Sequence, residues 1–388
     1  MMDDTWLSGA APLAESAALI AQLVSIRSYP GQEHGVQNAV AQWLSENGLP
    51  ADFQETGEAP NVIARIENGQ GPTLLFNGHV DTVLAAANWS CDPWQGKREG
   101  SKFYGLGACD MKAGVAATML ATRALARRPD LWRGTVIFSA VVDEEAYSIG
   151  ARALVRAIKA DTRQNLAVPD ACIVAEPSFD QPFLGAVGKV LVRADITGRA
   201  SHGSEPERGV NAAVEGAKLL AKLGEMKLGR HPRLTASQCV LAFNSGSDQY
   251  VITVPEKARF TINRHIVPGE TGESVLAEMD ALAESLHSPA RFTFAIDPPY
   301  YPPWEIAAEH PVIQKFAHAY QAVTGHAPNF GYSGGVADSN YFAADLGAPT
   351  VYFGPRGDRL HQSDEWVDLD SMAPTVDIYL RLALAVLH

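Results

Sequence analysis

The chain has 388 residues, of which 46% are hydrophobic and 19% are charged. One hydrophobic core stops growing at roughly 250–300 residues, so we expect a folded protein of two domains rather than a disordered chain. The formal net charge of −13 argues against nucleic acid or an anionic membrane surface as a partner.

The first part of the chain alternates patterns typical of helices and strands. Apolar residues between Val36 and Leu44 recur at the spacing of one helix face, and the run Thr135 to Val142 is typical of a strand buried on both faces. Further strands are predicted at 62–66, 73–76 and 171–174, and a helix at 112–126. Strands alternating with helices predict an α/β fold with a mostly parallel sheet.

The pattern changes near residue 183. The segment from Lys189 to Ile196 alternates polar and apolar residues, as in a strand with one wet face. It is followed by a predicted helix at 211–226, strands near 239–243 and at 258–266, a helix at 270–286 and a strand at 291–296. The order β-α-β-β-α-β predicts a ferredoxin-like α+β domain.

The prolines between Pro298 and Pro303 are expected to break regular structure, which suits a return crossing between domains. The α/β pattern then resumes with a helix at 312–324, a strand at 350–353 and a helix at 371–387. The predicted organisation is therefore a first domain made of residues 1–182 and 297–388, with a second domain, residues 183–296, inserted into it.

The N-terminal residues show neither a basic nor an apolar leader region, and no apolar run approaches the length of a membrane span. We therefore expect a cytoplasmic protein with no membrane partner.

Residues that can bind a metal lie just after the predicted strands of the first domain. Ligands of parallel α/β sheets bind beyond the carboxyl ends of the strands. The polar residues found there are His79, Asp81, Asp143, Glu144, Glu145, Glu176 and His361. Asp110 lies between the turn at 105–107 and a helix. We expect these imidazoles and carboxylates to meet at one rim of the sheet.

Each residue also has an ordinary structural explanation. Asp110 is placed for a helix N-cap, Glu144 and Glu145 for an exposed turn, and a lone histidine near a strand end is often structural. If these explanations held for every residue, it would be a coincidence that all of them lie past strand ends of one sheet. Taken together, the residues therefore favour a metal site.

The number of candidate ligands indicates two metal ions. A catalytic zinc ion usually takes three protein ligands and a water, which is fewer than two histidines and three carboxylates provide. Such a set suits two ions about 3.5–4 Å apart, and metal ions lower the pKa of a neighbouring water from 15.7 towards ~7. A further carboxylate is then needed as general base. Glu144 and Glu145 are adjacent, so one can bind metal while the other acts as the base.

Five segments carry a resemblance to a known family. The motifs at 77–83, 105–112, 143–145 and 175–177, together with the late His361, resemble the M20 family of metallopeptidases and deacylases, in order and over nearly the whole chain. The resemblance implies two Zn²⁺ ions, with Co²⁺ or Mn²⁺ as substitutes, bridged by Asp110. The other implied ligands are His79 and Glu176 for one ion and Glu145 and His361 for the other. Glu144 would be the general base, and Asp81 would orient His79.

The inserted domain carries a second part of the resemblance. Residues 198–206, followed by 209–212, are similar to the lid motif of the family. In the family, the histidine at the position of His202 reaches into the partner subunit and stabilises the tetrahedral oxyanion, which implies a homodimer formed through this lid domain. The alternative is an exposed loop histidine with no catalytic part.

Two further segments resemble substrate-binding elements of the family. Arg264 matches an arginine that binds a substrate carboxylate, a contact suited to a guanidinium. Gly334 and Gly335 match a glycine-rich substrate loop, although an ordinary turn explains them almost as well. The chain departs from the family at Thr253, where many members have Asn, and carries Arg356 and Arg359 close to His361, either as surface charges or to select an acidic group.

These features predict a dinuclear zinc hydrolase that cleaves the amide bond of a small N-acyl amino acid with a free carboxylate, of the deacetylase or desuccinylase type. A dipeptidase or carboxypeptidase with the same chemistry is the alternative. A remote alternative is an inactive relative that serves as a binding or scaffold protein, but such a relative is expected to have lost ligands, and all five are present.

Overall fold

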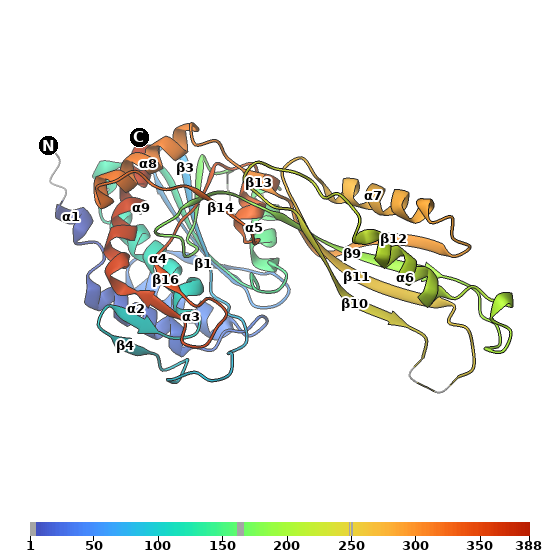
Figure 1. Cartoon of the computed structure of the whole chain (residues 1–388). Coiled ribbons are helices and arrows are strands. Elements are labelled where there is room, and N and C mark those ends of the chain that lie inside the picture. The colour runs from blue at the N-terminus through green and yellow to red at the C-terminus, as the bar shows by residue number, and fades with distance from the viewer. Residues whose placement is uncertain (1–4, 161–166, 248, 250) are drawn as a thin grey trace. The chain divides into compact units, whose positions relative to one another are not determined.

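The computed structural model describes residues 5–160, 167–247, 249 and 251–388 (Figure 1). The chain divides into two compact units. Unit 1 comprises Met1–Leu184, Glu305–Gly331 and Ala337–His388, and unit 2 comprises Gly185–Trp304 and Tyr332–Val336.

A nine-stranded sheet, most of whose residues belong to unit 1, runs in the order β1-β2-β6-β3-β7-β15-β8-β13, with β14 paired to β8. Its strands are β1 (Ala51–Gln54), β2 (Asn61–Asn68), β3 (Thr73–His79), β6 (Gly134–Val141), β7 (Ala171–Val174), β8 (Phe183–Ala186), β13 (Trp304–Glu305), β14 (Gly331–Ser333) and β15 (Thr350–Tyr352). The four neighbours β6, β3, β7 and β15 are parallel, so their carboxyl ends meet at one edge. The predicted α/β fold is confirmed.

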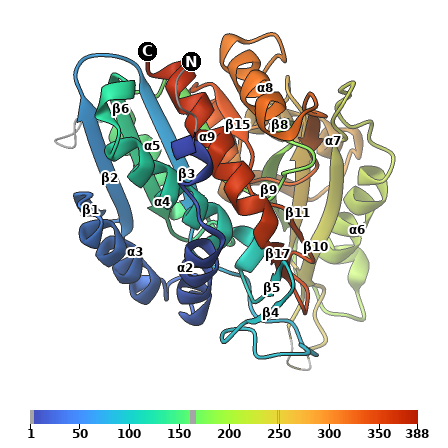
Figure 2. The same ribbon diagram turned by 90° about the vertical axis from the view of Figure 1, so that its left-hand side faces the viewer.

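Helices cover this sheet. They are α1 (Thr5–Ser8), α2 (Leu13–Ser25), α3 (His34–Glu46), α4 (Ala113–Ala126), α5 (Ile149–Lys159), α8 (Pro311–Thr324) and α9 (Met372–Val386). Helix α4 packs on β3 and β6, and α9 lies between α4 and α8 (Figure 2). Because α4 is buried from Ala113 to Leu125, its small residues meet the sheet on one side and other helices on the other.

Short helical turns connect the larger elements. They are η1 (Ala108–Lys112), η2 (Pro129–Leu131), η3 (Pro206–Arg208), η4 (Tyr341–Asp345) and η5 (Leu369–Ser371). The first is irregular, because Asp110 and Met111 have non-helical backbone angles and the peptide bond between them is cis.

A second, four-stranded sheet of unit 1 was not predicted. It runs in the order β16-β17-β5-β4 and consists of β4 (Lys97–Glu99), β5 (Lys102–Tyr104), β16 (Gly357–Asp358) and β17 (Trp366–Asp368). Strands of two or three residues are too short to show a periodic pattern. The pairing of β17 with β5 brings the segment after His361 beside the segment that precedes Asp110.

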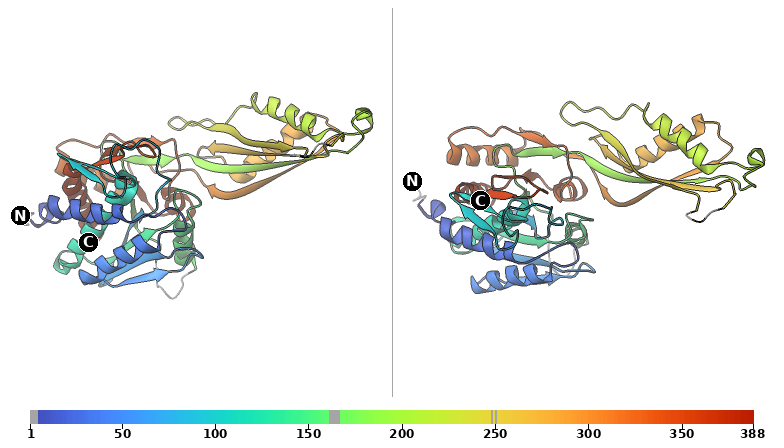
Figure 3. Two further views of the ribbon diagram at one scale, coloured as in Figure 1. Left: turned by 90° about the horizontal axis from the view of Figure 1, so that it is seen from below. Right: turned by 60° about the horizontal axis from the view of Figure 1, so that its bottom comes forward.

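Unit 2 contains an antiparallel sheet in the order β10-β11-β9-β12. Its elements are β9 (Gly188–Thr197), α6 (Ala212–Leu223), β10 (Ser237–Ser245), β11 (Lys257–Ile266), α7 (Gly272–Ser285) and β12 (Arg291–Tyr301). Both helices lie on the same side of the sheet (Figure 3). This is the predicted ferredoxin-like arrangement.

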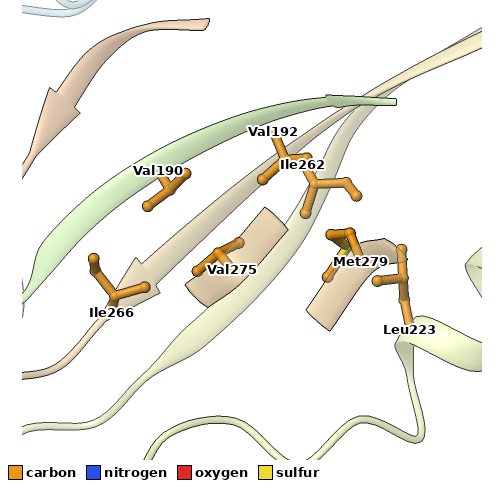
Figure 4. Close-up of a cluster of buried hydrophobic side chains, with 7 residues drawn as sticks. All are labelled: Val190, Val192, Leu223, Ile262, Ile266, Val275 and Met279. Carbon is orange, nitrogen blue, oxygen red and sulfur yellow. The ribbon is translucent and has the colours of Figure 1, made fainter. Parts of the chain in front are cut away.

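Apolar side chains fill the space between the helices and the sheet of unit 2 (Figure 4). Val190, Ile262 and Met279, which come from β9, β11 and α7, are each at most 1% exposed. The alternation along β9, buried at every second residue, explains why one face of this sheet is covered and the other is not.

The expected break of structure at the proline cluster is wrong in part, because β12 continues to Tyr301. The register of β12 against β9 shifts between Asp297 and Tyr301. Proline lacks an N–H to donate, and β12 is an edge strand, where that loss is tolerated.

Candidate metal centre

The polar residues predicted to lie past strand ends do meet at one edge of the large sheet. His79 is the last residue of β3, Asp143, Glu144 and Glu145 come after β6, and Glu176 comes after β7. Residues Asn77, Ser139 and Val174 are paired across these three strands, so their ends are level. His361 reaches the same place from the segment between β16 and β17.

Asp110 lies between two imidazoles. Nε2 of His79 is 3.2 Å from Oδ1 of Asp110, and Nε2 of His361 is 3.3 Å from Oδ2. Asp110 and His79 are buried, whereas the His361 side chain is 53% exposed. The carboxylate therefore presents one oxygen to each histidine.

The remaining carboxylates lie on either side of Asp110. His361 Nε2 is 3.1 Å from Glu145 Oε2, while His79 Nε2 is 3.8 Å from Glu176 Oε1 and 4.0 Å from Glu144 Oε2. Two groups have ligand atoms within 4.8 Å of one another: His79 with Asp110 and Glu145, and His79 with Glu144 and Glu176. All five predicted ligands and Glu144 are thus brought together.

Asp81 contacts the next loop more closely than it contacts His79. Its two carboxylate oxygens accept the backbone N–H groups of Glu144 and Glu145 at 3.1 and 2.9 Å. Nδ1 of His79 lies 3.1 Å from the backbone oxygen of Asp81 and 3.4 Å from its Oδ1. Asp81 therefore fixes the loop of two acids as well as flanking the imidazole.

The acids and imidazoles of the site shift one another's pKa values. Burial raises the pKa of Glu144 and of Glu176 well above the ordinary value, and repulsion from Glu176 adds to it for Glu144, as repulsion from Asp110 does for Glu176. Burial by itself would raise the pKa of Asp110. Hydrogen bonds with His361 and His79 have the larger combined effect, so the pKa lies well below its ordinary value. Hydrogen bonds with Asp110 and Glu145 raise the pKa of His361 to about 10.

This donor set fits a pair of divalent metal ions. Four carboxylates, from Asp110, Glu144, Glu145 and Glu176, face two imidazoles, so the buried donors carry an excess of negative charge that divalent cations would balance. Imidazole nitrogen and carboxylate oxygen are the donors that zinc takes in catalytic sites.

Two buried acids near this centre were not predicted from the sequence. Glu365 is 1% exposed and lies four residues after His361, and Asp338 is 1% exposed and lies three residues after Gly335. Burial raises the pKa of Asp338 to about 7. The signal that could have found them is, in each case, an acid at short spacing from an already suspected residue.

Three predicted residues lie in unit 2 and are exposed. Nδ1 of His202 is 2.7 Å from the hydroxyl of Ser204, and His202 pairs through its backbone with Thr253. Gly334 and Gly335 form a turn in which the Ser333 hydroxyl accepts the N–H of Gly335 at 3.1 Å. Their roles stay predictions.

Arg264 lies on the face of β11 that the helices cover, and it is fully buried. Its guanidinium forms ion pairs of 2.7 Å with Glu270 and with Glu278. The predicted contact with a substrate carboxylate stays a prediction, and in this structure the guanidinium is held by two carboxylates of the protein.

The two arginines beside His361 are engaged with acids of unit 1. Arg356 contacts both oxygens of Asp180 at 2.7 Å and Asp368 at 3.1 Å. Arg359 lies 3.6 Å from Asp364. In this structure both guanidinium groups therefore pair with acids of the protein itself.

Comparison with known proteins agrees with the fold. Residues 75–385 match the model of peptidase family M20/M25/M40, and the chain belongs to this family. It is accordingly a metal-dependent hydrolase that acts on amide bonds.

Individual relatives match over almost their full length. The chain is 28% identical over 387 residues to a succinyl-diaminopimelate desuccinylase of Cereibacter sphaeroides, covering 95% of this chain and 98% of the relative. Among solved structures, aminopeptidase PepT of Bacillus cereus has a TM-score of 0.77 at 22% identity, covering 97% of this chain and 100% of that one. The YXEP protein of Bacillus subtilis, a dinuclear metal-binding peptidase, has a TM-score of 0.71 at 17% identity, covering 97% and 98%.

Among the described helices, none combines the length and the apolar character that a membrane crossing requires.

Proposed function

We propose that the chain is a dinuclear zinc-dependent hydrolase that cleaves the amide bond of a small N-acyl amino acid bearing a free carboxylate. The observation that carries the proposal is the position of Asp110 between His79 and His361, with distances of 3.2 and 3.3 Å to its two oxygens. A carboxylate that offers one oxygen to each side is suited to bridge two metal ions.

The other ligands divide between the two sides of Asp110. His79 and Glu176 would hold one ion, and Glu145 and His361 the other. Two bound zinc ions supply a Lewis acid for the scissile carbonyl and lower the pKa of the attacking water, and Co²⁺ or Mn²⁺ can take their place.

Glu144 is the acid that remains for proton transfer once the five metal ligands are assigned. Its side chain is 10% exposed, 4.0 Å from His79 Nε2, and its backbone is fixed by Asp81. Glu144 accepts a proton from the attacking water and passes it to the leaving amine.

Unit 2 serves in this proposal as lid and dimerisation domain. Strand β10 lies at an edge of its sheet, and Val240, Leu241 and Phe243 on this strand are 39%, 59% and 42% exposed. An apolar, unpaired edge is a ready surface for a second copy of the chain. In the homodimer, His202 of the partner subunit would stabilise the oxyanion of the tetrahedral intermediate.

The nature of the substrate rests on the similarity to a succinyl-diaminopimelate desuccinylase. This relative supports an acyl amino acid over a longer peptide. Substrate contacts by Arg264, Gly334 and Gly335 are part of the proposal.

The test combines metal analysis with a substrate panel. We expect the purified protein to hold two equivalents of zinc and to hydrolyse one member of a panel of N-acetyl, N-succinyl and N-formyl amino acids. Dipeptides form a second panel, and turnover of dipeptides alone would replace the deacylase assignment by a peptidase. Absence of bound divalent metal from active protein would contradict the proposal altogether.

Two variants separate the roles of the adjacent acids. Glu144→Gln is expected to keep both metal ions and to lose activity by about 10²–10⁴-fold, the usual contribution of general acid–base catalysis. Glu145→Gln is expected to lose metal together with activity. A Glu144→Gln enzyme as active as the parent would remove Glu144 from the reaction.

The predicted cytoplasmic location stays a prediction, which fractionation of the native cells would check.

A further inference from the structure

Glu365 is a buried acid that has no part in the proposed reaction. It is the residue immediately before β17 and is 1% exposed. Its side chain points at backbone N–H groups of the loop that carries Asp110, rather than at the imidazoles of the metal centre.

Both carboxylate oxygens of Glu365 are occupied by this loop. Oε2 accepts the N–H of Gly107 at 2.9 Å, and Oε1 accepts the N–H groups of Cys109 and Asp110 at 2.8 and 3.0 Å. The backbone oxygen of Glu365 also accepts the N–H of Gly105 at 3.0 Å. Hydrogen bonds to an ionised acceptor are stronger than neutral ones, and successive backbone N–H groups form a concave site for an anion.

The loop needs such support because its own conformation leaves donors unpaired. Gly107 has a φ of 73°, and a Cβ there would lie 2.4 Å from Thr82. Asp110 and Met111 depart from helical angles, so their neighbours do not form a regular helix start. Glu365 supplies the acceptors that a regular turn would otherwise provide.

The same residue fixes the segment that carries His361. His361 lies four residues before Glu365 and has a φ of 60°. The adjacent Asp364 accepts the backbone N–H and the hydroxyl of Ser90 at 2.8 and 2.9 Å. The chain after His361 is therefore attached at two consecutive residues, to the loop at Ser90 and to the loop at Asp110.

We propose that Glu365 is a positioning residue that sets Asp110 and His361 relative to each other, so that one carboxylate can serve both sides of the metal centre. Asp81 has a similar part for Glu144 and Glu145, because its carboxylate accepts the backbone N–H groups of both. The inference rests on the proposed dinuclear function and extends it to a residue outside the two groups of candidate ligands.

The test is the metal affinity of a Glu365→Gln variant. Glutamine keeps one acceptor oxygen and turns an NH₂ group towards N–H donors, so at least one donor loses its partner. We expect the dissociation constant for Zn²⁺, measured by competition with a chelator, to rise by about 10–100-fold, the usual effect of losing a partner of the ligands. The visible spectrum of the Co²⁺-substituted protein should change as well.

A matched control separates positioning from general stability. Glu215 in unit 2 is 6% exposed and contacts Lys218 and Ser288, each through one carboxylate oxygen. Glu215→Gln should lower the unfolding midpoint of the metal-free protein while leaving zinc affinity within twofold of the parent. A Glu365→Gln protein with parental affinity and spectrum would overturn the inference, as would equal losses of affinity in both variants.

A milder variant covers the case in which Glu365→Gln does not fold. Glu365→Asp keeps the charge but shortens the reach, and we expect an intermediate loss of zinc affinity; a folded Glu365→Asp protein with parental affinity also overturns the inference. If the parent itself binds no divalent metal, it is the proposed function that fails.

Discussion

The carboxylate of Asp81 accepts a hydrogen bond of 2.9 Å from the backbone N–H of Glu145, a residue 64 positions away in the sequence. Its other oxygen accepts the N–H of Glu144 at 3.1 Å. Asp81 is fully buried, so these bonds form out of reach of solvent. One side chain thus fixes the backbone of both acids that are proposed to act on the metal and on the substrate.

Asp81→Asn is therefore expected to disturb two functions at once. An amide keeps one acceptor oxygen, so one of the two N–H groups loses its partner. We expect kcat to fall and the zinc dissociation constant to rise, each by about 10–100-fold. Steady-state kinetics and chelator competition measure the two effects.

Asp170 offers the control for Asp81. It accepts the backbone N–H of Thr73 at 2.7 Å, at the opposite end of the same strand, β3. Asp170→Asn removes a similar bond without touching the centre and should leave kcat within twofold. If Asp81→Asn behaves like Asp170→Asn, the anchoring role of Asp81 is wrong.

The backbone that carries Glu176 is enclosed by two glycines. A Cβ on Gly114 would lie 2.0 Å from the carbonyl oxygen of Ala175, and one on Gly354 would lie 2.2 Å from the same atom. Gly114→Ala and Gly354→Ala must push this backbone aside, at a cost of about 1–3 kcal/mol. We expect lower stability in urea titrations and weaker metal binding, because Glu176 moves with Ala175.

Gly224→Ala is the control for these substitutions. Gly224 ends α6 with a φ of −65°, and a Cβ there would meet its nearest neighbour at 3.5 Å. The alanine should be neutral or slightly stabilising. Parental stability in Gly114→Ala would show that the contact with Ala175 is not tight.

The ion pairs of Arg264 predict an effect on stability. Arg264→Met would leave Glu270 and Glu278 without their shared cation, and breaking a buried pair costs about 3–5 kcal/mol. We expect a lower urea midpoint for this variant. A KM raised more than tenfold with parental stability would instead support direct binding of a substrate carboxylate.

Glu33 should make the stability of unit 1 depend on pH. It is fully buried at the start of α3, and burial together with the charge of Asp81 raises its pKa from 4.5 to about 7. Between these values the unfolded chain releases the proton while the folded chain keeps it, so this residue costs stability as the pH rises. Glu33→Gln should gain roughly 1–3 kcal/mol over the parent at pH 8 and little at pH 5.

Urea unfolding at the two pH values checks this prediction. Glu46 lies at the other end of α3 and is exposed, so Glu46→Gln is the matched control. If the free energy of unfolding differed between Glu33→Gln and the parent by the same amount at both pH values, the raised pKa would be contradicted.

The apolar edge of unit 2 predicts the oligomeric state. Leu241 on β10 is 59% exposed, so Leu241→Glu should not disturb the folded chain. We expect sedimentation to shift from dimer to monomer, with loss of activity if His202 acts across subunits. Leu84→Glu is the control, because Leu84 is 75% exposed in unit 1. An active parent that sediments as a monomer would exclude the role of His202 across subunits.

The sequence predicted those parts of the molecule that have a periodic signal. The run at 135–142 and the alternation at 189–196 correspond to β6 and β9, and the polar residues just past the strand ends lie together in one cluster that could hold metal ions. The pairing of β17 with β5 could not be predicted, because strands of three residues carry no period. Glu365 and the ion pairs of Arg264 depend on contacts between distant segments, which no local pattern reports.

The order of the proposed ligands along the chain bears on how the protein is made. His79, Asp110, Glu145 and Glu176 precede the body of unit 2, and His361 comes after it. A nascent chain can fold much of its sheet while the proposed metal centre is still incomplete, since the last proposed ligand, His361, is made only after the body of unit 2. Complete metal loading then has to wait until unit 2 has been made, and a chain that stops before residue 361 is born without a complete site.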